Sequence, residues 1–125
     1  MIEEEGPGWR FARDPERGQF PVLIGGASWA IELTEVEWRA MVALIKELTD
    51  QHQQLIGQLM MEEHLFLEKE LLPWWGCLDG DRSEWSLKLL LQGGGEITTR
   101  GVEVYWPIPA AQAFVKAMRT TWDSC

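Results

Sequence analysis

The chain has 125 residues, of which 46% are hydrophobic and 25% are charged. These fractions are ordinary for one globular domain and exclude a chain that is disordered throughout. Twenty acidic residues against eleven Lys and Arg give a net charge of −9, which opposes binding to nucleic-acid phosphates or to anionic membranes. We expect a soluble cytoplasmic protein, because no apolar run spans a bilayer and the acidic N-terminus is unlike a secretory signal.

The N-terminal segment "MIEEEGPG" is acidic and ends in turn-forming residues, so we predict a flexible acidic tail over residues 1–8. A single α+β domain is then expected over residues 9–122. The two cysteines fit a reducing compartment, because a domain of this size does not need a disulfide. We interpret Cys77 as a small packed residue and Cys125 as an exposed thiol.

Short strands are predicted in the first third of the domain. Segments 9–13 and 20–24 are separated by the turn-forming "DPERGQ". Segment 28–33 alternates large apolar residues with small or polar ones, which is typical of a half-buried strand.

A long helix is predicted to follow, because Thr34 and Glu37 have the spacing of a capping box. Apolar residues then recur every three or four positions over about six turns, or ~35 Å. This stripe comprises Trp38, Met41, Ile45, Leu48, His52, Leu55 and Leu59, and His52 is its one polar member. A helix of this length in a small domain must cross the whole sheet or extend past it to a partner.

The rest of the chain predicts further strands and a closing helix. The expected strands are 64–71, 74–78, 85–92, 96–99 and 102–106, and the expected helix is 107–122 with prolines in its first turn. Antiparallel strands followed by a helix thus occur twice. We predict an α+β fold with one antiparallel sheet of about six to seven strands, one long central helix and a C-terminal helix.

The eight tryptophans divide into core and surface candidates. Trp29, Trp85 and Trp106 share strand parity with aliphatic residues, which predicts that they are core residues. Adjacent strand residues point to opposite faces, so at most one of Trp74 and Trp75 lies in that core. The other indole, near Leu72, Leu90 and Tyr105, is expected to form a patch that a second chain, a helix or a ligand covers.

Two clusters of acidic residues could suggest metal-binding sites, but their spacing does not match known ligand sets. Asp79, Asp81 and Glu84 lack the ligand spacing of a calcium loop, and turn chemistry accounts for the aspartates. The group Glu62, Glu63, His64 and Glu68 matches no recognised ligand set. We therefore predict no metal, no cofactor and, because no catalytic motif is found, no enzyme activity.

Four segments carry a family resemblance: "GWRF", "LMMEEHLFLEKE", "PWWGCLDG" with "SLKLLLQGGG", and "GVEVYWP". Together they resemble a family of short cyanobacterial and chloroplast proteins of unknown function, over roughly residues 8–120. The resemblance implies a cyanobacterial cytosol or plastid stroma. It also implies a duplicated fold similar to the Whirly-type single-stranded-DNA-binding transcriptional regulators, or alternatively a cystatin-like fold. It carries no functional residues.

These observations favour a non-enzymatic binding or regulatory protein that acts as a homodimer or with another protein. The expected interface consists of the helix stripe Trp38, Met41, Ile45, Leu48, His52, Leu55 and Leu59, together with Trp74 and Trp75. A single-stranded nucleic-acid-binding transcriptional regulator is an alternative by fold analogy, opposed by the absence of a basic patch. A second alternative is a small-ligand binder with an apolar pocket near Trp75, Trp85 and Trp106.

Overall fold

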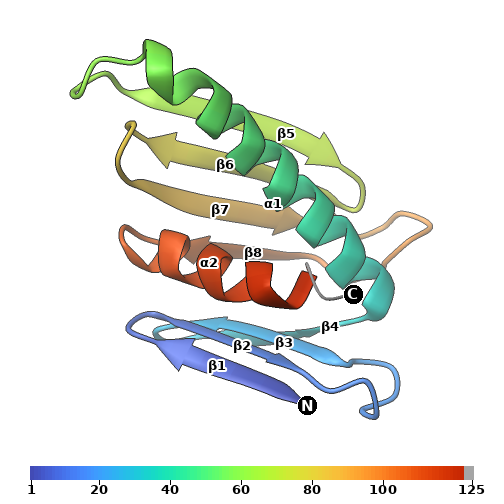
Figure 1. Cartoon of the computed structure of the whole chain (residues 1–125). Helices are drawn as coiled ribbons and strands as arrows, with labels where there is room; N and C mark the ends of the chain where they lie inside the picture. The colour runs from blue at the N-terminus through green and yellow to red at the C-terminus, as the bar shows by residue number, and fades with distance from the viewer. Residues whose placement is uncertain (123–125) are drawn as a thin grey trace.

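The computed structural model describes residues 1–122, which form eight strands, two α-helices and one short 3₁₀ helix (Figure 1). Four strands precede each α-helix, so the predicted repetition of strands and then a helix is observed. The elements are β1 Ile2–Gly6, β2 Trp9–Arg13, β3 Val22–Gly26, β4 Ala30–Leu33, α1 Glu35–Leu55, η1 Ile56–Gln58, β5 Leu65–Leu71, β6 Trp74–Gly80, β7 Trp85–Leu91, β8 Val102–Trp106 and α2 Ala110–Trp122.

The strands form two sheets, which corrects the prediction of one sheet of six to seven strands. Each sheet is antiparallel and has four strands in chain order, β1 to β4 in one and β5 to β8 in the other. Alternation along a strand identifies its faces but carries no information about which edges join. That limit accounts for the error.

The N-terminal segment forms an edge strand rather than the expected flexible tail. β1 pairs with β2 along its whole length, from Ile2 opposite Arg13 to Gly6 opposite Trp9. Glu5 lies opposite Arg10, an arrangement of opposite charges that stabilises a strand pair. The acidic composition suggested a solvated tail, but the backbone gains its hydrogen bonds from the neighbouring strand.

Helix α1 begins with the predicted capping box. The Thr34 Oγ1 accepts from the backbone N–H of Glu37 (3.1 Å), and the Glu37 Oε1 accepts from the backbone N–H of Thr34 (2.8 Å). The helix ends at Leu55 and continues as η1, so the predicted extension to Leu59 is wrong. Gly57 weakens helix propagation at this point.

In the second half, β5, β6, β7 and β8 agree with predicted strands to within a few residues. Segment 96–99, predicted as a strand, lies in the loop between β7 and β8. Helix α2 begins at Ala110 rather than at Pro107. Pro107 and Pro109 instead accept hydrogen bonds from Ala111 and Ala113 through their carbonyl groups.

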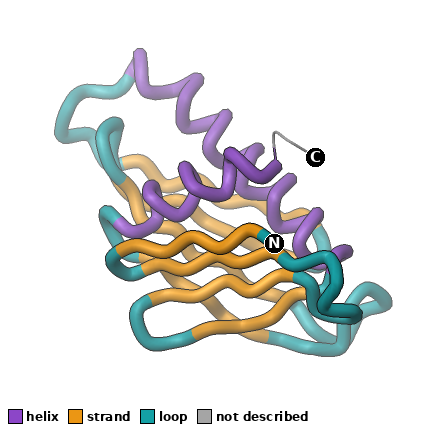
Figure 2. The backbone as a smooth tube through the Cα atoms, turned by 60° about the horizontal axis from the view of Figure 1, so that its bottom comes forward, coloured by secondary structure: helices purple, strands orange, loops and turns teal. Residues whose placement is uncertain are grey.

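Both helices lie on the same side of the strands (Figures 1 and 2). Helix α1 packs on β5 and β6, whereas α2 packs on β7 and also on β1 and β2 of the other sheet. The helix of the second half therefore covers the sheet of the first. Neither helix is long and apolar enough to cross a bilayer within the described residues.

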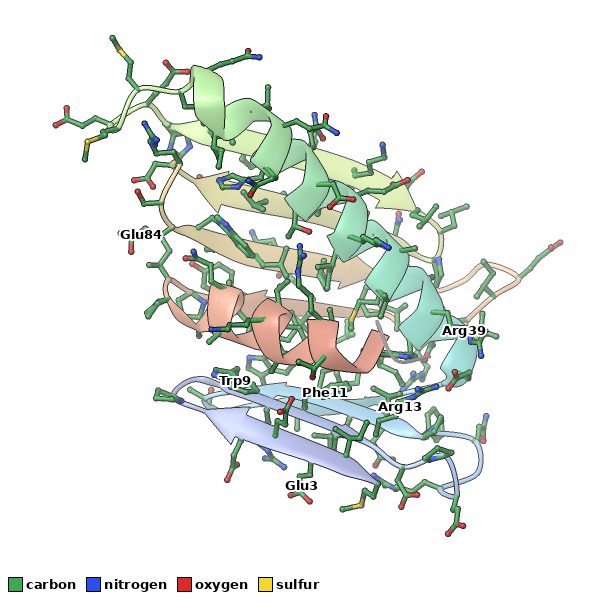
Figure 3. The ribbon with its side chains drawn as sticks, in the orientation of Figure 1. Glu3, Trp9, Phe11, Arg13, Arg39 and Glu84 are labelled. Atoms are coloured by element: carbon green, nitrogen blue, oxygen red, sulfur yellow. The ribbon has the colours of Figure 1, made fainter. Side chains whose placement is uncertain are left out.

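Strand β2 illustrates how parity assigns residues to the covered side. Figure 3 shows Trp9, Phe11 and Arg13 on the side of β2 next to α2, whereas Glu3 of β1 points away. Phe11 is buried and stacks on Trp38 of α1, with ring centroids 5.1 Å apart. The first sheet thus contributes its inner face to the same core as α1.

Trp106 joins the two sheets at the centre of the molecule. Its indole N–H donates to the carbonyl oxygen of Gly25 in β3 (2.9 Å), and its ring stacks on Phe114 of α2 with centroids 4.1 Å apart. Trp29 contacts the same ring at 5.2 Å. Trp85 and Trp106 are buried and Trp29 is half-buried against the core, which confirms their assignment to the core face.

Candidate functional site

The second sheet has an outer face that neither helix covers (Figure 1). Gly76 of β6 marks the inner face, because a Cβ atom there would meet Leu44 and Leu48 of α1. The residues on either side of Gly76 therefore point outward, by the period of two in a strand. One side of this four-stranded sheet is core and the other is surface.

Aromatic and aliphatic side chains lie next to one another on this outer face. Trp75 pairs directly with Leu90, and Tyr105 pairs with Lys88, the outward neighbour of Leu90 on β7. Leu90 is 38% exposed and Tyr105 47% exposed, whereas Trp75 is half-buried. We call Trp75, Leu90 and Tyr105 the Trp75 patch. A contiguous apolar patch of this kind is a common mark of an interaction surface.

Acidic residues surround the Trp75 patch. The outward-facing charged residues of the four strands are Glu68, Glu70, Asp79, Lys88 and Glu103. Lys88 is the one base among these five, and it forms an ion pair with Glu103 (3.6 Å). The outer face is therefore apolar at its centre and negative at its margin. Phe66, 50% exposed on β5, belongs to the same face and was not singled out by the sequence.

The predicted helix stripe lies elsewhere, inside the chain's own core. Trp38, Met41, Ile45, Leu48 and His52 are buried between α1 and the sheets. Leu55 and Leu59 are half-buried. The stripe was expected at an interface because the helix looked too long for the domain, but the 21-residue helix crosses the second sheet and buries the stripe within one chain. This corrects the helix part of the expected interface.

The structure distinguishes the two indoles of the Trp74–Trp75 pair. Trp74 is fully buried, and its indole N–H donates to the carbonyl oxygen of Glu37 (2.9 Å). Trp75 points to the outer face, as strand parity required of one member of the pair. The part of the expected interface that stays at the surface is therefore Trp75, which lies opposite Leu90 as predicted, with Tyr105 on the same face one strand further on.

The acidic turn between β6 and β7 has the local chemistry expected from its sequence. Oδ1 of Asp81 accepts hydrogen bonds from the backbone N–H groups of Ser83 (2.8 Å) and Glu84 (3.0 Å). These two bonds hold the pKa of Asp81 below its ordinary value. Asp79 contacts His64 (2.9 Å) rather than joining this turn. Among the described residues, no group of His, Cys, Asp and Glu has the geometry of a metal site.

Cys77 lies on the outer face of β6 but is buried by its neighbours. Burial raises the pKa of its thiol, and Asp79 and Glu68 add to the effect against the opposing charge of Lys88. A thiol that stays protonated is a weak nucleophile. Cys125 lies outside the described residues.

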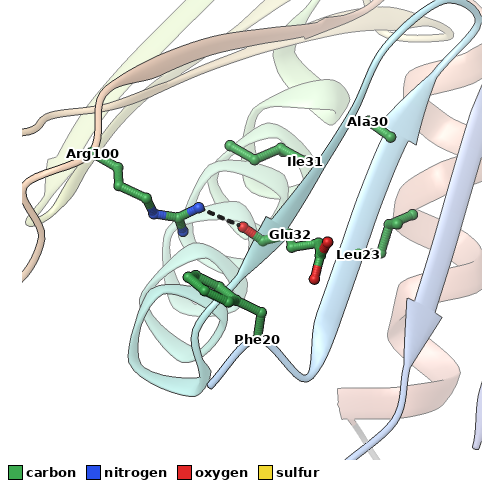
Figure 4. Close-up of a pocket in the computed structure, with 6 residues that line it drawn as sticks. All are labelled: Phe20, Leu23, Ala30, Ile31, Glu32 and Arg100. Carbon is green, nitrogen blue, oxygen red and sulfur yellow. Dashed lines mark hydrogen bonds between the residues drawn. The ribbon is translucent and has the colours of Figure 1, made fainter. Parts of the chain in front are cut away.

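A second surface feature lies where the loop before β8 meets the first sheet. Arg100 donates from Nη1 to the carbonyl oxygen of Glu32 (2.9 Å), and its guanidinium lies 4.8 Å from the ring centroid of Phe20 (Figure 4). These residues line an open hollow of ≈ 410 Å³ together with Leu23 and Ala30. No sequence pattern predicts this contact, because Arg100 is isolated in a turn.

Arg100 also pairs with the carboxylate of Glu37, the capping residue of α1. Burial alone would raise the pKa of Glu37, but hydrogen bonds from the Thr34 backbone and from Thr98 and Arg100 outweigh it and lower that pKa. The buried carboxylate is therefore charged and fully partnered. This arrangement resembles a structural clamp more closely than a catalytic acid, whose pKa is raised towards neutrality.

Two comparisons place this architecture among known proteins. Residues 4–121 match the family described as "Domain of unknown function (DUF1818)". The chain belongs to the DUF1818 family. No match was found among curated proteins.

A crystal structure from the cyanobacterium Prochlorococcus sp. NATL2A is similar to the DUF1818 chain. Its protein is described as one of unknown function from the DUF155 family, and it shares 46% sequence identity. The alignment covers 98% of this chain and 99% of the other, with a TM-score of 0.90. The resemblance to a cyanobacterial family of unknown function is confirmed. The Whirly-type likeness, the cystatin-like alternative and the chloroplast branch stay predictions.

Proposed function

We propose that this DUF1818 chain is a non-enzymatic binding protein that docks a partner protein on the outer face of β5 to β8. The partner's contact surface is apolar at its centre and carries Lys and Arg at its margin. The single observation that carries the proposal is the uncovered sheet face with the Trp75 patch at its centre.

The chemistry of the patch supports a protein partner. Trp and Tyr are enriched among the residues that contribute most to protein–protein binding, where a rigid ring buries a large area. Trp75 is half-buried in a strand, so its ring loses little freedom when a partner covers it. Leu90 on the adjacent strand β7 and Tyr105 on the next strand, β8, extend the apolar area.

The charge around the patch favours a basic partner. Glu68, Glu70 and Glu103 point outward beside the patch, with Lys88 as the opposing base. Basic residues on a partner would meet these carboxylates and speed the encounter, an effect that salt screens. A second copy of the chain would instead bring like charges together. This charge pattern makes a homodimer the weaker candidate, and it opposes a single-stranded nucleic acid for the same reason.

In the test, the wild-type protein is immobilised and a lysate of its source organism is passed over it, so that proteins that bind are captured. Each recovered protein is purified and its affinity measured by titration with wild type and with the Trp75→Ser and Tyr105→Ser variants. Val36→Ala is the matched control, because Val36 is a 60% exposed apolar residue on α1. We expect a basic partner whose Kd rises about tenfold or more for both patch variants, and whose binding weakens in salt.

Three results would count against the proposal. One is a partner whose affinity is unchanged by both patch variants. Another is that the pure protein sediments as a dimer and the Trp75→Ser variant as a monomer. That result would favour the homodimer hypothesis instead. The third is saturable binding of a single-stranded oligonucleotide that the patch variants abolish, which would favour the nucleic-acid alternative.

A further inference from the structure

A pocket of ≈ 290 Å³ lies at one end of the second sheet, where the turn between β5 and β6 meets the loop between β7 and β8 (Figure 1). Leu72 and Pro73 line it from the turn, and Gln92, Ile97 and Thr98 line it from the loop. We call it the Leu72 pocket. Leu72 is 61% exposed and Ile97 48% exposed, so two large aliphatic side chains of its wall are open to solvent. Exposed apolar side chains gathered in a hollow are a common mark of a binding site.

Hydrogen bonds hold both walls of the Leu72 pocket in place. The backbone N–H of Gln92 donates to the carbonyl oxygen of Pro73 (2.8 Å), which joins the loop to the turn. Thr98 is buried, and its Oγ1 accepts from the backbone N–H of Arg100 (3.1 Å). The pocket is therefore preformed, so little ordering entropy is lost when a ligand fills it.

The Leu72 pocket adjoins the outer face that carries the Trp75 patch. Nε2 of Gln92 donates to Oε2 of Glu70 (3.2 Å), and Glu70 lies opposite Trp75 in the strand pairing. Leu90 is two residues before Gln92, a step of ~7 Å that returns to the same face of a strand. A partner that covers the Trp75 patch therefore reaches the pocket with a neighbouring residue.

The charge beside the Leu72 pocket is negative. Glu96 lines the pocket and Glu70 adjoins it, and neither forms an ion pair with any base of the described chain. The nearby bases Lys69, Lys88 and Arg100 are each paired with another carboxylate. Two carboxylates without a cationic partner favour a ligand that brings Lys or Arg.

We propose that the Leu72 pocket takes one large apolar side chain of the basic partner protein, and that Lys or Arg beside this anchor residue contact Glu70 and Glu96. The inference rests on the proposed function, because the same partner covers the Trp75 patch. The volume is just below the range of roughly 300–1,000 Å³ for small-molecule sites, and an anchor side chain needs less room than a whole ligand. Anchors that fill pockets contribute much of the affinity of protein interfaces.

The probe for this inference is a short peptide, capped at both ends, with Phe at its centre and two Lys on each side. It is titrated into the isotopically labelled full chain while NMR follows the backbone amides. We expect saturable shifts at Gln92, Ile97 and Thr98, with an affinity that weakens in salt. Ala in place of Phe should weaken binding about tenfold or more, because the anchor loses its apolar burial. Glu in place of each Lys should abolish binding.

Each of these comparisons has a contrary result. Equal affinity of the Phe and Ala peptides, or no saturable shift at the pocket amides, would overturn the anchor site. Undiminished binding of the Glu peptide would overturn the assignment of a basic ligand.

Variants of the chain locate the peptide in the pocket. Leu72→Ser and Ile97→Ser replace exposed side chains, so both proteins should fold, and each should raise the Kd of the Phe peptide about fivefold or more. Met61→Ser is the matched control, because Met61 is 73% exposed near the opposite end of β5. Glu96→Gln should weaken the peptide and reduce its salt dependence, whereas Glu62→Gln, the same change of charge in the loop before β5, should not. Equal losses in the pocket variants and their controls would overturn the site.

Three outcomes with the purified partner separate this inference from the proposed function. A loss of affinity in Trp75→Ser but not in Leu72→Ser would overturn the pocket and leave the outer face as the binding site. A loss in Leu72→Ser but not in Trp75→Ser or Tyr105→Ser would support the pocket and overturn the patch. Wild type that sediments as a dimer, with Leu72→Ser as a monomer, would show that a second copy fills the pocket and would overturn the basic partner.

Discussion

The guanidinium of Arg100 pairs with the carboxylate of Glu37, although 63 positions separate the two residues in the chain. Glu37 is 1% exposed in the first turn of α1, and Arg100 reaches it from the loop before β8. Arg100 also donates to the carbonyl oxygen of Glu32 in β4. One side chain thus ties the loop of the second half to the sheet and helix of the first.

Replacing Arg100 should destabilise the fold. In Arg100→Gln the buried carboxylate of Glu37 loses its charged donor, and we expect the free energy of unfolding to fall by about 2–3 kcal/mol. Urea denaturation measures the change. Arg17→Gln is the control, because it removes an exposed ion pair with Glu32 and should cost about 0.5 kcal/mol or less. Equal losses in the two variants would show that Arg100 is no clamp.

The lowered pKa of Glu37 predicts an acid-dependent loss of stability. The folded-state pKa lies below the ordinary value of 4.5, so the stabilisation is full above that value and disappears as the pH falls through the lowered pKa. The difference in unfolding free energy between wild type and Glu37→Gln should therefore be constant near neutrality and shrink below about pH 4.5. A difference that grows towards acid pH would contradict the assignment. The pKa of Asp81 is lowered as well, but Asp81 is present in both proteins. The difference between wild type and Glu37→Gln therefore isolates the contribution of Glu37 to the pH dependence of stability.

Gly76 should tolerate no side chain. An added Cβ atom would lie 2.7 Å from Cδ2 of Leu89 and 3.0 Å from Cδ2 of Leu44, so Gly76→Ala forces these two buried leucine side chains to move within the packed core. We expect a loss of about 1–3 kcal/mol in urea denaturation. Gly57→Ala adds the same atom where nothing lies within 4 Å, and should be neutral or slightly stabilising. If Gly76→Ala were as stable as Gly57→Ala, the packing of α1 on β6 would be wrong.

The adjacent tryptophans should respond unequally to truncation. Trp74→Ala empties a fully buried site and should lower the unfolding free energy by about 3–5 kcal/mol. Trp75→Ala exposes strand backbone on the outer face but leaves the core intact, so we expect a loss below about 1.5 kcal/mol. Chemical denaturation of both variants under one condition tests the pair. A larger loss for Trp75 would reverse the assignment of the two faces.

Local patterns in the sequence were sufficient to predict most elements. The capping box at Thr34 and Glu37 is a contact between residues three apart, and the structure contains both of its hydrogen bonds. Strand parity separated Trp74 from Trp75 without a structure, because the side-chain period of a strand is two. These features depend only on neighbours in the chain.

Features that depend on distant residues were missed for a physical reason. Three features depend on which segments of the chain meet: the pairing of β1 as an edge strand, the division into two sheets and the Arg100–Glu37 ion pair. Composition carries no information about such contacts. The Leu72 pocket combines a turn and a loop that the strands β6 and β7 separate in the chain, and no local spacing connects them. The stripe on α1 was visible in the sequence, yet whether another chain or the same chain covers it was not.

The most direct test of the proposed binding face is hydroxyl-radical footprinting of the protein, free and bound to its purified partner. The method reports the exposure of side chains, so it distinguishes the two faces of one sheet. We expect protection of Trp75, Tyr105 and Phe66, with no change at Met60 and Met61, which are exposed in the loop between η1 and β5. Unchanged oxidation of Trp75 and Tyr105 in the complex, with protection on the helix side, would contradict the proposal.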